Sequence, residues 1–160
     1  GTPKRDVIVA LGGNDVVLGR GGNDIICLGR GHDRAFGGNG NDRILGQQGH
    51  DLIRGQKGND RLDGNAGRDR LYGERGRDRL RGGNHYDRAW GGPGDDLILG
   101  QAGDDALYGN QGRDRVLGGP GNDRMWGWDQ SDRLIGGSGR DQARGGSGRD
   151  RCSAEFRQSC

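Results

Sequence analysis

A nine-residue register runs through this chain without interruption. Counting in steps of nine from Asp6 reaches an aspartate seventeen times in succession. These residues are Asp6, Asp15, Asp24, Asp33, Asp42, Asp51, Asp60, Asp69, Asp78, Asp87, Asp96, Asp105, Asp114, Asp123, Asp132, Asp141 and Asp150. A fixed period with no insertion or deletion predicts stacked repeats rather than a globular domain around one core.

Glycines and apolar residues complete the repeated unit. Glycine lies two positions before the aspartate in fourteen of the seventeen units and five positions before it in fifteen. An apolar residue follows each aspartate by two positions. The unit is therefore G-x-x-G-x-D-x-U-x, where U is apolar. It covers residues 1–153 as a single domain and leaves residues 154–160 as a short C-terminal tail.

Each position of the unit has a structural interpretation. Glycine at the first and fourth positions allows positive φ and close backbone approach, so G-x-x-G-x-D is expected to form a turn. The segment x-U-x is expected to be a strand of about three residues. Two units then close an 18-residue coil, and U residues from two parallel sheets face each other across a thin core. The predicted fold is an all-β parallel solenoid of about eight and a half coils, stacked roughly 4.8 Å apart.

Three stretches carry a resemblance to a known family. GGNGNDRIL (37–45), GGPGDDLIL (91–99) and GGPGNDRMW (118–126) are similar to the nonapeptide of the repeats-in-toxin (RTX), or haemolysin-type, calcium-binding proteins. The resemblance implies a parallel β-roll. It also implies calcium ions between successive turns of one edge, ligated by aspartates and by turn carbonyls.

The sixth position is invariant, which ordinary turn chemistry does not require. Turns accept asparagine or serine as well as aspartate, and the fifth position varies in that way. A constant carboxylate indicates an oxygen ligand for calcium, which takes six to eight oxygens. All seventeen aspartates are therefore predicted to be metal ligands. They form two columns with eight and seven gaps, so the predicted maximum is fifteen calcium ions.

The composition favours folding that depends on a ligand. Only 28% of the residues are hydrophobic, and 38 of the 160 are glycine, the residue that loses most conformational freedom on folding. Burial of so few apolar side chains is a weak driving force. A ligand that binds only the folded chain would add the missing stability by mass action.

The basic residues depart from the acidic character typical of RTX repeats. Arginine fills the seventh position of ten units, and the net charge is +2. Three interpretations stay open. The arginines could solubilise the outer face, pair with the aspartates in an ion-free structural solenoid, or form a cationic surface.

Aromatic residues recur at the ninth position of alternate units. Tyr72, Trp90, Tyr108 and Trp126 are expected to stack as four rungs on one outer face. They form either an intramolecular ladder or a binding platform. With the arginines beside them, they make a possible surface for an anionic polymer, a cell-surface polysaccharide rather than nucleic acid; these arginines are Arg70, Arg88 and Arg124.

The cysteines indicate an oxidising compartment. Cys152 and Cys160 are eight residues apart and are predicted to form a disulfide that hooks the tail over the last coil. Cys27 lies about seven coils from Cys152 and is expected to stay unpaired. A disulfide fits a secreted, extracellular or cell-surface protein.

The N-terminal end is unusually apolar at positions expected to face outward. This patch predicts a contact with another domain, a cap or another copy of the chain; it consists of Val7, Val9, Val16, Leu18, Ile25 and Cys27.

Other functional classes find little support in the sequence. No stretch approaches the roughly 18–20 apolar residues of a membrane span. No G-K-[ST] phosphate loop occurs, and no serine, cysteine or histidine lies beside a base outside the repeat. A non-enzymatic role is therefore expected.

Overall fold

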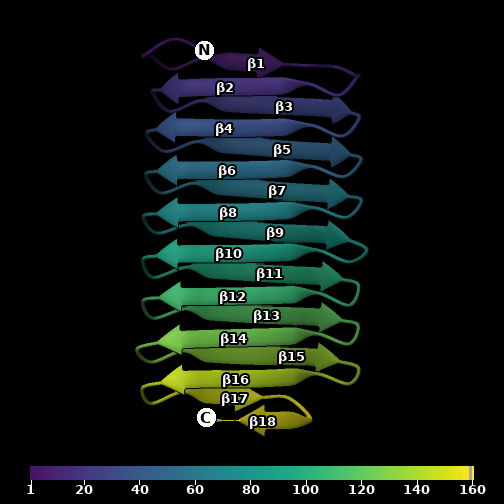
Figure 1. Cartoon of the computed structure of the whole chain (residues 1–160), viewed down its shortest axis with the longest axis vertical. Helices are drawn as coiled ribbons and strands as arrows, with labels where there is room; N and C mark the ends of the chain where they lie inside the picture. Colours follow the sequence, from purple (N-terminus) through teal and green to yellow (C-terminus); the bar gives the residue numbers. More distant parts are fainter. Residues whose placement is uncertain (159) are drawn as a thin grey trace.

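Successive repeats alternate between two parallel β-sheets. The computed structural model describes residues 1–158 and Cys160. Odd-numbered strands form the first sheet, in the order β1 to β17, and even-numbered strands form the second, from β2 to β18 (Figure 1). Pairing advances by 18 residues per coil, for example from Ile44 to Leu62 and from Leu62 to Leu80. The predicted parallel β-roll with 18-residue coils is confirmed.

The strands are longer than the three residues expected from the repeat. Pairing resumes beyond the first-position residue, as between Gln47 and Asn65, so most strands have six residues. The first sheet contains β1 (Val7–Val9), β3 (Ile25–Arg30), β5 (Arg43–Gln48), β7 (Arg61–Ala66), β9 (Arg79–Asn84), β11 (Leu97–Ala102), β13 (Arg115–Pro120), β15 (Arg133–Ser138) and β17 (Arg151–Ser153). The second contains β2 (Val16–Gly21), β4 (Arg34–Asn39), β6 (Leu52–Lys57), β8 (Arg70–Arg75), β10 (Arg88–Pro93), β12 (Ala106–Gln111), β14 (Arg124–Asp129), β16 (Gln142–Ser147) and β18 (Phe156–Gln158).

Positive φ angles occur at the second and fourth positions of the repeat. In one unit φ is 79° at Gln47 and 131° at Gly49, whereas φ is not positive at the first-position Gly46. The expectation of positive φ at the first position is therefore wrong. Glycine is needed there for a different reason: a Cβ on Gly46 would lie 2.5 Å from Oδ2 of Asp51 and 2.7 Å from the carbonyl oxygen of Gly64.

The core is one stack of eighth-position side chains between the two sheets. Most of them are completely buried, and Leu28, which replaces a first-position glycine, joins them. The buried eighth-position residues are Val17, Ile26, Ala35, Ile44, Ile53, Leu62, Leu71, Leu80, Ala89, Ile98, Leu107, Val116, Met125, Leu134 and Ala143. Both sheets contribute side chains to this core, which is therefore thin and runs along the roll.

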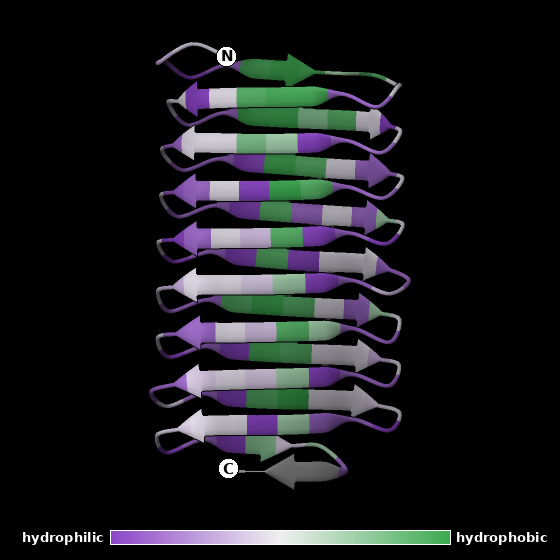
Figure 2. Cartoon of the chain, in the orientation of Figure 1, coloured by the Kyte–Doolittle hydropathy of each residue, from purple (hydrophilic) through white to green (hydrophobic). Residues whose placement is uncertain are grey.

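The two ends of the roll differ. At the N-terminal end, Val7, Leu11 and Val16 are 68%, 76% and 61% exposed, and β1 is apolar throughout (Figure 2). At the C-terminal end, residues Phe156–Gln158 pair with β16 and add a strand beyond the last repeat. Cys152 and Cys160 form a disulfide with their Cα atoms 5.8 Å apart, and Cys27 is unpaired.

Candidate metal site: two columns of aspartates

The sixth-position aspartates form two columns, one along each edge of the roll. The first column runs from Asp6 to Asp150 before the strands of the first sheet, and the second runs from Asp15 to Asp141 before those of the second. From Asp24 to Asp141 every column aspartate is at most 3% exposed. The predicted ligands are therefore brought together by position, inside the coils.

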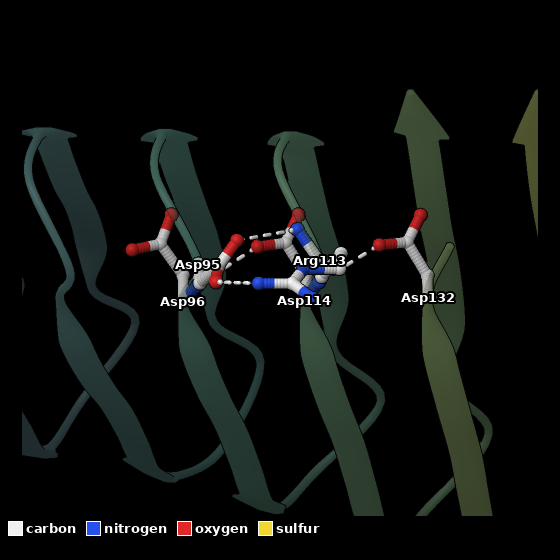
Figure 3. A network of polar contacts seen from close by, with 5 residues as sticks. All are labelled: Asp95, Asp96, Arg113, Asp114 and Asp132. Atoms are coloured by element: carbon white, nitrogen blue, oxygen red, sulfur yellow. Dashed lines mark hydrogen bonds and ion pairs between the residues drawn. The ribbon is translucent and has the colours of Figure 1, made fainter. Parts of the chain in front are cut away.

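From Asp24 to Asp150, each column carboxyl group is held to the preceding coil by one of its two oxygens. Oδ1 accepts a hydrogen bond from the backbone N–H of the aspartate 18 residues earlier, at 2.7–3.0 Å throughout both columns. Figure 3 shows this relationship along Asp96, Asp114 and Asp132. A side chain here replaces the backbone carbonyl that would normally accept this N–H.

The second oxygen, Oδ2, has no hydrogen-bond partner. It is buried and unsatisfied in Asp15, Asp24, Asp33, Asp42, Asp51, Asp60, Asp69, Asp78, Asp87, Asp96, Asp105, Asp114, Asp123, Asp132 and Asp150. Buried polar atoms normally have partners, and leaving one unsatisfied costs roughly 1–3 kcal/mol, or more when it is charged. Oδ2 of Asp51 and the carbonyl oxygen of Gly64 both lie over the Cα of Gly46, which offers only a weak C–H donor. A carboxyl oxygen and a backbone carbonyl oxygen thus converge at this turn, as they also do over Gly64 and Gly73.

Burial raises the pKa of these carboxyl groups. It lifts the pKa to about 8 in Asp87 and Asp96, against a backbone N–H donor that lowers it, and neighbouring column carboxylates raise it further. The pKa is about 7 in Asp60, Asp69, Asp123 and Asp132, and about 6 in Asp42, Asp78, Asp105 and Asp114. The ionised columns therefore need a compensating positive charge.

Arginine does not supply that charge. The ion pairs among the described residues are Arg54–Glu74, Arg113–Asp95 and Arg140–Glu155, and none contains a column aspartate. Seventh-position arginines such as Arg61 and Arg79 are exposed on the outer faces. The interpretation that Asp–Arg pairs hold an ion-free solenoid is therefore wrong.

The available donors fit calcium better than zinc or another transition metal. The converging atoms are all oxygens, and calcium accepts carboxylate and carbonyl oxygens in variable geometry. The described residues contain no group of three or more His, Cys, Asp or Glu side chains that could hold one ion. Backbone carbonyls would have to complete the coordination, together with Oδ2 of the column aspartates. The first-position glycines, such as Gly64 beside Asp51, present such carbonyls.

A second ladder, which the repeat pattern did not predict, runs through the fifth position. Here a side-chain acceptor receives the backbone N–H of the fifth-position residue one coil later, as from Asn41 to Asn23 at 2.8 Å. His32 and His50 take part through Nδ1, and their rings stack with centroids 4.8 Å apart. The sequence signal was the preference for Asn, Asp, His and Ser at this position, all of which can accept.

This fifth-position ladder has interruptions. The backbone N–H groups of Arg68 and Arg77 donate the last hydrogen bond of their series, and a guanidinium group has no acceptor to continue it. One coil after Arg68, on the same edge, the fifth position is Tyr86, whose hydroxyl accepts a hydrogen bond from Nε of Arg88 at 2.7 Å. On the second-column edge, the ladder starts again at Asp104, which accepts from Asn122.

The aromatic residues of the second sheet form a continuous stack. Ring centroids are 4.5 Å apart from Tyr72 to Trp90, 5.2 Å from Trp90 to Tyr108 and 4.5 Å from Tyr108 to Trp126, with nearly parallel planes. The guanidinium of Arg54 covers the end of the stack at Tyr72, 4.9 Å from its centroid. Neighbouring rings cover one another, so mainly ring edges face the solvent. This geometry favours an intramolecular ladder over a stacking platform.

Comparison with known proteins agrees with this geometry. No curated protein matches the chain. The sequence model of the RTX calcium-binding nonapeptide repeat, which comprises four copies of the unit, matches nine overlapping segments: residues 1–35, 29–62, 36–71, 54–89, 63–98, 81–116, 90–125, 108–143 and 126–155. Together these segments cover nearly the whole chain, so this protein belongs to the family of RTX calcium-binding nonapeptide repeats.

Proposed function

We propose that this chain is a non-enzymatic structural module that folds around calcium ions. The observation that supports this most directly is the buried, partnerless Oδ2 of fifteen column aspartates. A buried carboxylate oxygen without a donor can be stabilised by a proton or by a cation. The repeats of this family bind calcium, which is the cation that fits here.

Each part of the turn has a separate role in this proposal. Oδ1 of a column aspartate stays bonded to the neighbouring coil, as Asp78 is to Asp60, and keeps the carboxyl group in place. Oδ2 and the carbonyl oxygens of the turn would hold the ion. Bound calcium supplies the positive charge that allows buried carboxylates to stay ionised. Because the sites exist only between stacked coils, binding favours the folded chain.

The proposal includes an extracellular or cell-surface location. It is supported by the disulfide between Cys152 and Cys160, since such bonds persist in oxidising compartments. In the part of the chain that the structure describes, there is no helix that could cross a membrane. The exposed apolar N-terminal end would contact a neighbouring domain, a cap or another copy.

Elemental analysis combined with circular dichroism tests the calcium proposal. The desalted protein should retain several calcium ions per chain, up to about fifteen, because each coil gap supplies oxygen ligands. Stripping them should convert the far-ultraviolet spectrum from β to coil, and calcium should restore it. An unchanged β spectrum and melting temperature after complete removal of the metal would refute calcium-dependent folding.

A second candidate function is calcium-gated binding of an anionic polymer. The chain carries +2, and fifteen calcium ions would add 30 charges, giving +32 in a fully loaded roll. The surface expected for this role is formed by exposed arginines beside the aromatic ladder, namely Arg70, Arg88 and Arg124. Retention on heparin resin should require calcium and decrease steeply with salt. Passage of the calcium-loaded protein through the resin at low salt would eliminate this function.

A further inference from the structure

A groove lined by arginines follows the first-column edge of the roll. It has a volume of about 740 Å³ and lies between fifth-position and seventh-position side chains of successive coils. Six arginines line it: Arg43, Arg61, Arg77, Arg79, Arg113 and Arg115. The groove is distinct from the surface beside the aromatic ladder, which belongs to the second sheet.

The arginines form two sides of this groove. Arg43, Arg61 and Arg79 are in register on the adjacent strands β5, β7 and β9, so their backbones are about 4.8 Å apart. Arg77 and Arg113 come from the turns on the other side. All of these side chains are exposed. A long, flexible cation repeated at this spacing can follow a linear ligand along the axis of the roll.

The acidic residues of the groove do little to neutralise it. Asp60, Asp78 and Asp96 are at most 2% exposed, and their Oδ1 atoms accept N–H groups within the column. Asp95 is the acidic residue with an exposed carboxylate, and it pairs with Arg113 at 3.1 Å (Figure 3). Six guanidinium groups thus face one accessible carboxylate.

The chemistry of the lining discriminates between polyanions. Guanidinium groups bind sulfate, carboxylate and phosphate through paired N–H donors. Proteins that hold single-stranded nucleic acid usually also stack bases on aromatic side chains. No aromatic residue lines this groove, whereas Tyr86 lines both grooves of the second-column edge. The ligand that fits is a chain of anionic groups without bases.

We propose that the first-column groove binds a linear sulfated or carboxylated polysaccharide along the axis of the roll. This inference uses the folded roll and therefore rests on the proposed function, to which it adds a ligand class and a location. The seventh-position arginines of β7 and β9 are the central contacts, because they have arginine neighbours along the strand row and across the groove.

Paired substitutions with the same charge change test the groove. Heparin is the probe, and affinity is measured by calorimetry in calcium at several salt concentrations. The groove variant is Arg61→Gln with Arg79→Gln. The matched control is Arg34→Gln with Arg151→Gln, two exposed arginines at the same repeat position that lie outside the groove. The groove variant should lose about tenfold in affinity, with a salt slope reduced by about two because two ionic contacts are lost. The control should change by less than about twofold.

Each alternative result is informative. Equal losses in both variants, or a larger loss in the control, would overturn the groove as the binding site. Single-stranded oligothymidine that binds the wild type as tightly as heparin, and is lost in the groove variant, would assign the groove to nucleic acid and contradict the polysaccharide. A folded wild type that ignores heparin would overturn the inference and leave the calcium-dependent module intact. A roll that stays folded and binds heparin without calcium would retain the groove and refute the calcium proposal.

Discussion

The backbone N–H of Asp60 donates a hydrogen bond of 2.7 Å to Oδ1 of Asp78, one coil later. Oδ2 of the same Asp78 carboxyl group is buried without a partner. One oxygen of this side chain stabilises the stacking of coils, and the other is available to a ligand. The two roles can therefore be separated by substitution.

Replacing Asp78 with asparagine should remove calcium without removing the coil contact. Asparagine keeps an Oδ1 acceptor for the N–H of Asp60. Its Nδ2 would take the place of Oδ2 and can donate to the carbonyl oxygen of Gly91, because both Oδ2 of Asp78 and this carbonyl oxygen lie over the Cα of Gly73. We expect about two fewer ions per chain by elemental analysis, because the side chain borders two gaps between coils. In calcium, the β spectrum of the variant should be retained, because the other gaps between coils keep their ligands. Asp63→Asn, at a ninth position outside the columns, is the control; an unchanged ion count in Asp78→Asn would contradict the ligand assignment.

The metal-free roll should become less stable as the pH rises. Burial raises the pKa of Asp87 and Asp96 from 3.8 to about 8, so the folded chain holds these protons more tightly than the unfolded chain. Stability from this source is complete below pH 3.8 and is lost progressively as the pH rises towards 8. In a chelator, the β signal of the far-ultraviolet spectrum should therefore be weaker at pH 8.5 than at pH 6. With calcium bound, stability should instead increase with pH, since protons and calcium compete for the same oxygens. A chelated protein that is more stable at pH 8.5 than at pH 6 would contradict the raised pKa values.

Adding one methyl group at a first-position glycine should disrupt the turn. A Cβ on Gly46 would lie 2.5 Å from Oδ2 of Asp51 and 2.7 Å from the carbonyl oxygen of Gly64. Gly46→Ala should lower the free energy of unfolding by about 1–3 kcal/mol or more and weaken calcium binding at that turn. Gly21→Ala is the control, because its Cβ would meet no atom closer than 3.7 Å and φ is not positive there. Similar unfolding curves for both variants would show that Oδ2 and the carbonyl tolerate a filled space.

Loss of the disulfide should destabilise the C-terminal end. The bond between Cys152 and Cys160 closes a short loop, for which the chain-entropy estimate is about 2–3 kcal/mol. Cys160→Ser should therefore lower the melting temperature, and Cys27→Ser should have a smaller effect because Cys27 is unpaired. Peptide mapping without reduction identifies the pairing directly. A bridge between Cys27 and Cys152 would be incompatible with their positions on β3 and β17.

The fold was predictable because its two strongest determinants are visible in the sequence. The nine-residue period fixes the coil, and the apolar eighth position fixes which side of each strand faces inward, as Ile44, Leu62 and Leu80 show. The placement of the aspartates at the turns follows from the same register. Strand length was underestimated because a second-position residue such as Gln47, despite its positive φ, still pairs with the neighbouring coil.

The contacts between side chain and backbone were not predictable from the repeat alone. The coil spacing of roughly 4.8 Å was expected, but the repeat does not state that Oδ1 of Asp78 accepts the backbone N–H of Asp60 across that spacing. The same spacing lets His32 accept the N–H of His50. The idea that arginines pair with the aspartates failed because the seventh and sixth positions face opposite ways: Asp60 is buried and Arg61 is exposed.

The aromatic stack lies where the fifth-position ladder is interrupted. On the second-column edge no fifth-position hydrogen bond among the described residues joins Arg68 to Tyr86 or Tyr86 to Asp104, and the stacked pairs Tyr72–Trp90 and Trp90–Tyr108 connect those same coils. An aromatic pair contributes about 0.5–1.5 kcal/mol, comparable to the net contribution of a hydrogen bond. Ring stacking thus replaces the missing hydrogen bonds between these coils. Under a pulling force along the axis of the roll, the middle coils should resist separation about as well as the coils at either side.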